Sequence, residues 1–404
     1  MTKPRRRQAG EGTIGTYDTK TKGTLYLAKW GEPQADGTTK QRLQRGFGTR
    51  KAAADHLREV NSSIARGVYV APNKVTVEDH FNEWVDSLRK QPSTVASYRK
   101  NVRLHVLPLL GHYPLAQLTG TRLTKHYKHL EESGRVDGKG GLSPRTVRYV
   151  HTIIHSALGA AVRDGLLLTN PADKADPPTA KQAASPEMHF WKATELRAFL
   201  DQRKQAEDEL LPAWSLLAST GIRRGEALAL RWGDIDWTAS RLSIRRAVTL
   251  IKNKGEGQSL VVGKTKSGKP RVVDLDTQTL AMLKAHKASQ GSIALSLARD
   301  DSYVLGNLQG AIRHPERFSR RFETALRQAR AELGEAQLPA IRLHDLRHTH
   351  ATLLLAAGVP VKVVSERLGH ANATITLGVY AHVMPGMQQQ AAETFGALLM
   401  GGTA

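Results

Sequence analysis

Residues 344–348 read HDLRH and contain two histidines four positions apart with an arginine between them. Two histidines at this spacing on a helix are typical of zinc sites. Arg347 argues against a metal, because it would share a helical face with His344 and His348 and hold a permanent positive charge beside a dication. The chain also has no cysteine to complete a zinc shell. His344 and Arg347, three apart, instead suit a negatively charged ligand.

Three further stretches in the C-terminal half contain side chains that could act on the same kind of ligand. They are 219–236 with Arg223 and Glu226, 261–275 with Lys264, and 365–383 with His370 and Tyr380. Each has an ordinary structural interpretation: a helical ion pair, a solvated hairpin lysine, a helix C-terminal cap and a half-buried tyrosine. Their order and joint spacing, more than any one residue, favour a common site.

A phosphodiester is the ligand that gives all of these side chains a chemical task. Arginines can each bind non-bridging oxygens with two parallel hydrogen bonds, and a histidine can donate to them or help to remove the nucleophile's proton. A lysine can protonate the leaving oxygen, and a tyrosine can attack phosphorus to form a covalent intermediate. We expect the nearby cations to lower the pKa of Tyr380 from its ordinary value of about 10.

At these residues the sequence resembles the tyrosine recombinases, the phage integrase family. The family pattern is an arginine in a T-G-[LIM]-R-x-x-E context, a β-hairpin lysine, H-x-x-R, a histidine or tryptophan after L-G, and a tyrosine about ten residues later. The matching residues, which the resemblance assigns to catalysis, are Arg223, Lys264, His344, Arg347, His370 and the nucleophile Tyr380. Glu226 and Asp345 fall at positions that the family tends to fill with acids, and we expect them to support the arginine and the histidine.

The resemblance implies a site-specific recombinase that integrates or excises a phage or another mobile element through a 3′-phosphotyrosyl intermediate, without metal, ATP or cofactor. Its partners would be double-stranded DNA attachment sites, bound as a homotetramer, with accessory DNA-bending or excision factors. Alternatives are a type IB topoisomerase-like strand transferase and a catalytically inactive DNA-binding regulator on the same fold. A metal-dependent nuclease would require clustered carboxylates, which the sequence lacks.

The composition agrees with a nucleic-acid partner. The chain has 59 Lys and Arg against 37 Asp and Glu, a net charge of +22, and phosphate neutralisation supplies much of the affinity of DNA-binding proteins. The absence of cysteine fits a reducing compartment. No apolar run is long enough to span a membrane, and no signal-peptide pattern follows the basic start. We therefore expect a protein of the bacterial cytoplasm, associated with the nucleoid.

The expected fold class is multidomain α+β. Residues 1–70 read as a small β-sheet-plus-helix module, with strands at 24–30 and 40–48 and a helix at 49–67 opened by Thr49. This module resembles an arm-type DNA-binding domain. Residues 75–175 read as a helical bundle, which resembles a core-binding domain. Residues 186–404 would form a mostly α catalytic domain with a small antiparallel sheet.

Within these domains, the pattern predicts catalytic-domain helices at 194–207 and 211–231 and strands at 241–250, 259–264 and 270–275. In the bundle, apolar residues recur on one face of each helix, and basic residues fall outside that stripe. The candidate DNA-binding residues are Arg5, Arg6 and Arg7 in the N-terminal arm and Arg99, Lys100, Arg103, Arg145 and Arg148 in the bundle.

Two questions stay open at the level of sequence. Lys266 and Lys269 share the hairpin with Lys264, and only the G-K-T context favours Lys264. The segment after Tyr380 reads as a helix with one apolar face, which could pack on its own domain or dock on a neighbouring protomer. Gly378, just before the tyrosine, could loosen that segment.

Overall fold

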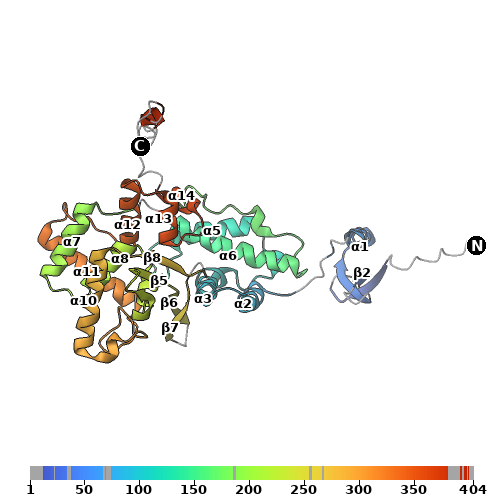
Figure 1. Cartoon of the computed structure of the whole chain (residues 1–404). Helices are drawn as coiled ribbons and strands as arrows, with labels where there is room; N and C mark the ends of the chain where they lie inside the picture. The colour runs from blue at the N-terminus through green and yellow to red at the C-terminus, as the bar shows by residue number, and fades with distance from the viewer. Residues whose placement is uncertain are drawn as a thin grey trace, which may run out of the picture. The chain divides into compact units, whose positions relative to one another are not determined.

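A computed structural model of the chain divides into two compact units, Met1–Ala184 and Ser185–Ala404, coloured from blue to green and from green to red in Figure 1. The structure describes residues 12–21, 23–33, 38–66, 69, 74–184, 188–253, 257–265, 268–380, 392–393, 395–397 and 399. Within these ranges, no helix combines the length and the apolar character that crossing a bilayer requires.

The first unit begins with a three-stranded antiparallel sheet of order β1-β2-β3 that packs against one helix. The bounds are Thr13–Thr19 (β1), Gly23–Pro33 (β2), Thr39–Phe47 (β3) and Arg50–Ala65 (α1). Trp30 of β2 and Leu57 of α1 belong to the same buried cluster. Thr49 caps α1 by accepting a hydrogen bond from the Ala52 backbone N–H. A sheet covered by one helix is therefore present here, as predicted.

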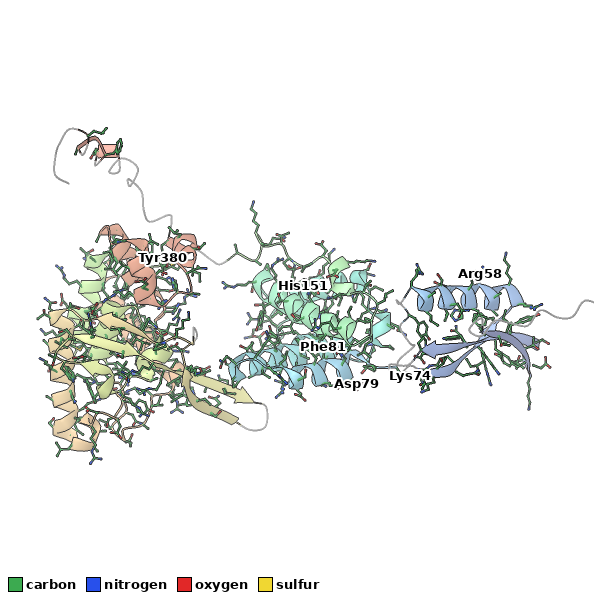
Figure 2. All side chains as sticks on the ribbon, turned by 45° about the vertical axis from the view of Figure 1, so that its right-hand side comes forward. Arg58, Lys74, Asp79, Phe81, His151 and Tyr380 are labelled. Carbon is green, nitrogen blue, oxygen red and sulfur yellow. The ribbon has the colours of Figure 1, made fainter. Side chains whose placement is uncertain are left out.

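The same unit continues as a helical bundle. Its elements are α2 (Val77–Ser87), α3 (Pro92–Asn101), the π-turn η1 (Val102–Val106), α4 (Leu107–Leu110), the 3-10 turn η2 (Leu115–Gln117), α5 (Gly120–Ser133), α6 (Pro144–Arg163) and the 3-10 turn η3 (Pro171–Lys174). Phe81 of α2, labelled in Figure 2, lies in one core with Ile154 of α6. Thr76 and Ser143 cap these two helices because each side chain accepts an N–H of the first turn.

The second unit is mostly helical. Its helices are α7 (Ala193–Gln205), α8 (Leu211–Thr220), α9 (Arg224–Leu228), α10 (Thr277–Ile293), α11 (Pro315–Leu333), α12 (Asp345–Ala356), α13 (Val361–Leu368) and α14 (Ala373–Tyr380), with 3-10 turns at Trp232–Asp234 and Leu295–Ala298. A core of large aromatic side chains, including Trp191, Trp214 and Phe322, holds α7, α8 and α11 together. The predicted mixed α+β fold class is confirmed.

The strands of the second unit form two small antiparallel sheets. Their bounds are Ile235–Asp236 (β4), Arg241–Ile244 (β5), Arg246–Asn253 (β6), Gly257–Lys264 (β7) and Arg271–Asp274 (β8). The single strand predicted at 241–250 is wrong: β5 pairs with β4 and β8, whereas β6 pairs with β7. The strand is divided because the chain changes sheets at Arg245. The alternation of apolar and polar residues along the sequence does not specify which strands pair with each other.

The helix predicted at 211–231 is also divided, and the division shapes the site. α8 ends at Thr220, and Gly221 adopts a left-handed backbone with φ 64°. Glycine adopts this conformation at little cost, whereas a side chain would be strained. The chain therefore turns after α8 and restarts as α9 with Arg223 at the N-cap position.

Candidate active site

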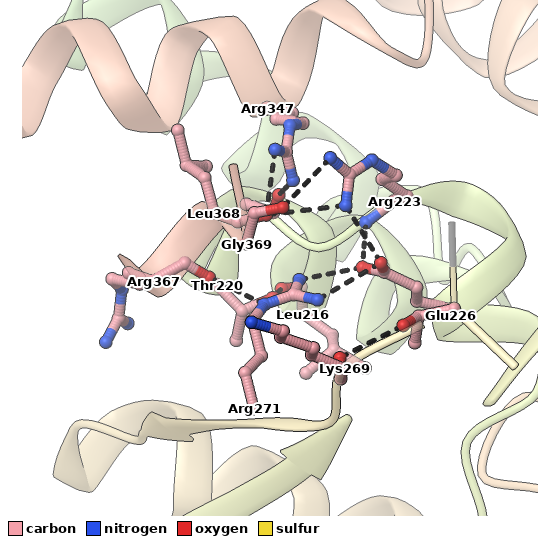
Figure 3. A network of polar contacts seen from close by, with 12 residues as sticks. Leu216, Thr220, Arg223, Glu226, Lys269, Arg271, Arg347, Arg367, Leu368 and Gly369 are labelled. Carbon is pink, nitrogen blue, oxygen red and sulfur yellow. Dashed lines mark hydrogen bonds and ion pairs between the residues drawn. The ribbon is translucent and has the colours of Figure 1, made fainter. Parts of the chain in front are cut away.

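Two arginines converge on the end of one helix. Arg347 donates from Nη1 to the Gly221 carbonyl and from Nη2 to the Leu368 carbonyl, each at 2.8 Å. Arg223 donates to the same end of α13, to Leu368 at 3.5 Å and to Gly369 at 3.3 Å. Figure 3 shows both guanidinium groups directed at these carbonyls. Residues 124 positions apart are thus brought to one place, with the fork-shaped donors close together.

Close backbone approach at two glycines makes this convergence possible. A Cβ at Gly221 would lie 2.7 Å from His350 Cδ2 and 2.8 Å from a methyl of Leu368. A Cβ at Gly369, whose φ is 68°, would lie 2.9 Å from the Arg271 side chain. Both glycines end helices in the left-handed conformation. Each glycine therefore combines a turn with a contact that no larger residue could make unchanged.

Glu226 is almost completely buried, with a side chain 1% exposed, and it orients Arg223. Its carboxylate accepts the Arg223 backbone N–H at 2.9 Å and the Arg223 Nη1 at 3.0 Å. Arg271 of β8 binds both carboxylate oxygens, at 3.1 and 2.7 Å, and donates from Nε to the Arg367 carbonyl at 3.0 Å. Burial acts to raise the pKa of Glu226, but the hydrogen bonds and charge of Arg271, followed by those of Arg223, give a net lowering.

Sequence reasoning missed Arg271. A basic residue on a short strand carries no sign that it pairs with a carboxylate 45 positions earlier in the chain. Figure 3 shows its guanidinium between Glu226 and the end of α13. Each nitrogen of this guanidinium donates a hydrogen bond to a neighbouring group, so Arg271 holds Glu226 and the end of α13 together.

The cluster carries excess positive charge, because in the described part of the chain three arginines, Arg223, Arg271 and Arg347, gather around one carboxylate, Glu226. Arg347 is 4% exposed. Desolvation, and then the charge of Arg223, lower the pKa of Arg347 to about 9, which leaves the guanidinium protonated at neutral pH. It uses two of its five N–H groups on carbonyls. An anion bound here would therefore relieve an unfavourable concentration of charge and still find free donors.

A cavity of about 360 Å³ lies against this cluster. Its walls are formed by Arg223, Arg224, Gly225, Ser319, Leu343 and His344. One wall thus contains a guanidinium and an imidazole from segments far apart in sequence. Among the described residues, no three His, Asp or Glu side chains are grouped as metal ligands would be.

Tyr380, labelled in Figure 2, is the last residue of α14 and is 1% exposed. Its hydroxyl lies 2.7 Å from His348 Nδ1. Burial raises the pKa of Tyr380 to about 12, and the charge of Arg347 offsets this only in part. The expected lowering of this pKa is therefore wrong for the structure described, because desolvation of the ring outweighs the cation.

His344 and His370 flank the arginines as neutral imidazoles. His344 immediately precedes α12 and keeps one side exposed, while desolvation and then His348 and Arg347 lower its pKa to about 4. His370 Nδ1 lies 2.8 Å from Thr376 Oγ1. Desolvation, followed by Arg347 and Arg223, lowers the pKa of His370 to about 4. At neutral pH both rings can donate one N–H without adding charge.

The hairpin lysines are placed differently. Lys264 is the last residue of β7, opposite Arg246, and its side chain is exposed. No hydrogen bond or ion pair among the described residues joins it to the arginines. Lys269 is exposed as well, and its carbonyl accepts from Thr265 Oγ1 at 3.1 Å. Lys266 lies outside the described residues.

Asp345 was expected to support the catalytic arginine and histidine, yet its carboxylate binds another residue. It is completely buried and accepts three hydrogen bonds from Arg342: from the backbone N–H at 2.7 Å and from the side chain at 3.1 and 3.0 Å. Asp345 therefore secures the start of α12, which carries His348 and Arg347. The local i, i+3 spacing of Arg342 and Asp345 was a signal available in the sequence.

Candidate DNA-binding residues of the bundle differ in their surroundings. Arg99 pairs with Asp86, and Arg148 donates to the Pro178 carbonyl at 2.7 Å. The remaining three, Lys100, Arg103 and Arg145, have exposed side chains. Arg5, Arg6 and Arg7 lie outside the described residues, as does most of the segment after Tyr380.

Solved structures share this fold. The integrase of transposon Tn1549, in complex with a circular intermediate DNA, aligns with a TM-score of 0.65 at 18% identity, over 79% of this chain and 99% of that one. A lambda integrase dimer bound to a core site aligns with a TM-score of 0.53 at 15% identity, over 95% of this chain and 96% of that one. At these identities the similarity concerns the fold alone.

Sequence comparisons identify the family to which the chain belongs. Residues 190–386 match the phage integrase family, and residues 76–130 match the phage integrase N-terminal SAM-like domain. A XerC-like tyrosine recombinase of Caldanaerobacter subterraneus subsp. tengcongensis is 30% identical over 87% of this chain and 90% of its own length. The ICEBs1 integrase of Bacillus subtilis is 26% identical over 76% and 79%. The chain belongs to the phage integrase family of tyrosine recombinases, enzymes that cut and rejoin DNA in site-specific recombination.

Proposed function

We propose that this recombinase integrates and excises a mobile element, with Tyr380 as the nucleophile that forms a 3′-phosphotyrosyl bond. The observation that carries the proposal is the convergence of Arg223 and Arg347 on one helix end, with neutral His344 and His370 beside them. The charge of Arg347 also reaches the Tyr380 hydroxyl. Anion-binding groups and a nucleophile thus lie within one unit.

In the proposed reaction, the two arginines bind the non-bridging oxygens of the scissile phosphate through their free N–H groups. Negative charge grows on these oxygens in the transition state, so preorganised donors lower the barrier. His344 and His370 donate further hydrogen bonds. Glu226 keeps Arg223 in place without contacting the DNA, because it is buried behind the guanidinium.

Attack by the Tyr380 oxygen breaks the bond from phosphorus to the 5′ oxygen. That oxygen leaves with the bonding electrons and takes a proton from Lys264, which must move in with the exposed β6–β7 hairpin. The phosphotyrosyl ester keeps the energy of the broken bond. The 5′-hydroxyl of a partner strand can then attack it, so no nucleotide or metal is needed for rejoining.

The proposed substrate is a pair of double-stranded attachment sites held by four copies of the chain. The net charge of +22 suits such a DNA partner. A lambda integrase tetramer bound to a Holliday junction has the same fold, with a TM-score of 0.52 at 16% identity. In this scheme residues 1–70 bind arm-type sites, residues 75–175 bind the core site, and residues 186–404 carry out catalysis. The boundary between the two compact units, at 184 and 185, and the family match at 76–130 support this division.

A suicide substrate tests the proposal. A nicked duplex carrying the element's core site releases a short 5′-hydroxyl fragment after cleavage, so that the covalent protein–DNA adduct accumulates. In EDTA the wild-type protein should form this adduct and Tyr380→Phe should form none. A requirement for divalent metal, or an undiminished adduct with Tyr380→Phe, would refute the mechanism.

The same adduct assay separates the alternatives. A topoisomerase-like strand transferase would form adducts on duplexes that lack the core site and relax plasmids without recombining them. An inactive regulator would bind the core site and form no adduct with the wild-type protein. The recombinase should form the adduct at the core site and exchange strands between two such sites.

A further inference from the structure

The hydroxyl of Tyr380 is in contact with a histidine that the family motif does not include. His348 Nδ1 lies 2.7 Å from Tyr380 Oη, and the two ring centroids are 5.7 Å apart. Because Tyr380 is 1% exposed, bulk water has little access to its hydroxyl. The residue beside the reacting oxygen is therefore His348.

His344, the histidine of the H-x-x-R motif, contacts the ring of His348 and is not hydrogen-bonded to Tyr380 in the described structure. Its ring meets the His348 ring edge-on, at 5.2 Å between centroids. No hydrogen bond among the described residues joins His344 to Tyr380. His344 is also exposed on the side of the cavity that Arg223 lines. This position suits a donor to the phosphate, and it leaves the contact with the tyrosine to His348.

Burial and the nearby charges keep His348 unprotonated, so its ring nitrogen is available as an acceptor. Desolvation lowers the pKa of His348, Asp345 acts to raise it, and Arg347 and Arg342 act to lower it, with a net lowering from the ordinary value of 6.5. His348 is therefore neutral at neutral pH. The pKa of Tyr380 is raised to about 12, so its hydroxyl is protonated. In the short contact, the Tyr380 O–H therefore donates to Nδ1, and the single N–H proton of the neutral imidazole is on Nε2.

We propose that His348 is the general base that deprotonates Tyr380 during strand cleavage. The proposal rests on the function given above, in which Tyr380 is the nucleophile. As the bond from Oη to phosphorus forms, the Tyr380 O–H bond breaks and its proton passes to Nδ1, which makes His348 an imidazolium. The 5′ oxygen leaves with its electron pair and is protonated by Lys264. In rejoining, the tyrosine oxygen leaves phosphorus and takes the proton back from His348.

An asparagine at position 348 separates proton transfer from positioning. Its side-chain oxygen can accept the tyrosine hydrogen bond from nearly the same place as Nδ1, but it cannot take the proton. Single-turnover cleavage of the suicide duplex by His348→Asn should be about 100-fold slower than wild type, a typical contribution of a general base. Binding of the duplex should change less than threefold. His189→Asn, an exposed histidine of the same unit, is the matched control and should behave as wild type.

Two further readouts distinguish the base from a structural role. The wild-type cleavage rate should fall as the pH is lowered and His348 becomes protonated. In His348→Asn this fall should disappear. The only remaining dependence of the rate on acidic pH should lie near pH 4, where His344 and His370 titrate. A duplex with sulfur in place of the 5′ bridging oxygen needs no protonation of its leaving group. It should restore Lys264→Ala and leave His348→Asn slow.

Three outcomes would overturn the assignment. One is a His348→Asn rate within threefold of wild type with an unchanged acidic limb. Another is rescue of His348→Asn by the sulfur duplex, which would show that His348 protonates the leaving group and does not deprotonate Tyr380. The third is binding of the duplex weakened by more than threefold in His348→Asn, which would show that the substitution disturbs the site as a whole and not proton transfer alone. An active Tyr380→Phe would instead refute the proposed function itself, so the two failures are distinguishable.

Discussion

The two halves of the candidate site are held in very different ways. On one side, Arg223, Glu226, Arg271 and Arg347 are linked by bidentate and backbone hydrogen bonds and are mostly buried. On the other side, one described hydrogen bond, to His348, holds the hydroxyl of Tyr380 at the end of an eight-residue helix. The anion-binding half is therefore fixed by many hydrogen bonds in the free protein, whereas the nucleophile half is held mainly by apolar packing of Tyr380 against residues such as Leu355 and Leu368. Apart from Tyr380 and His348, which take part in the proposed chemistry, changes in the first half should damage cleavage strongly and changes in the second half mildly.

Among the residues that bind or position the anion, the largest effect is expected for Arg347→Met, which keeps the side-chain length and removes the charged donors. Cleavage of the suicide duplex should fall by about 10³-fold, because loss of one transition-state donor typically costs 10²–10³ and two buried carbonyls also lose their partner. Single-turnover adduct formation measures this. A loss smaller than tenfold would contradict the conclusion that cleavage depends more on the anion-binding half than on the positioning of the nucleophile half.

Arg271→Met should come next, with cleavage reduced by about 10²-fold through the loss of Glu226 orientation. Arg271→Lys keeps the charge but not the fork, so it should recover only part of the rate. If Arg271 acts through Glu226, the double variant with Glu226→Gln should be no slower than the worse single variant. Multiplied effects would show that the two residues act independently.

The same glycine-to-alanine change can be made in each half. Gly369→Ala should slow cleavage by about tenfold and destabilise the protein by at least 1 kcal/mol, since φ is 68° and the new Cβ would lie 2.9 Å from Arg271. Thermal unfolding and adduct formation measure the two effects. A stable, fully active Gly369→Ala would contradict the rigid description of this half.

The smallest effect is expected for Gly378→Ala in the nucleophile half. Among the described residues beyond its own helix and chain neighbours, no atom lies within 4 Å of the Cβ that would be added. Alanine also favours a helix interior by about 1 kcal/mol over glycine. Cleavage should change by less than about threefold, with slightly higher thermal stability. A tenfold or greater loss of cleavage rate would show that Tyr380 needs the backbone flexibility of Gly378. The nucleophile half would then be as sensitive to substitution as the anion-binding half.

The sequence predicted the local features well. Thr49 caps its helix as expected, because capping depends on a few adjacent residues. The motif spacing also identified Arg223, His344 and Arg347, which the structure brings close together. The mixed α+β class followed from periodicity in the same way.

What the sequence could not predict depends on contacts between distant segments. The pairing of Glu226 with Arg271 and the close approach of Gly221 to His350 require the folded chain. The division of 241–250 between two sheets depends on the choice of strand partners. The contact between His348 and Tyr380 and the raised tyrosine pKa depend on burial, which residue types and spacing do not specify.

The carbonyls of Leu368 and Gly369 also act as stand-in acceptors for the two arginines. In the free protein they replace water as acceptors for the nearly buried Arg347 and for the partly exposed Arg223. Because the arginines keep further N–H groups for a phosphate, these carbonyls fix the guanidinium groups in place before a substrate arrives. The segment that provides the carbonyls continues directly into His370 and α14. One short stretch of backbone thus anchors both arginines at its start and carries Tyr380 at its end.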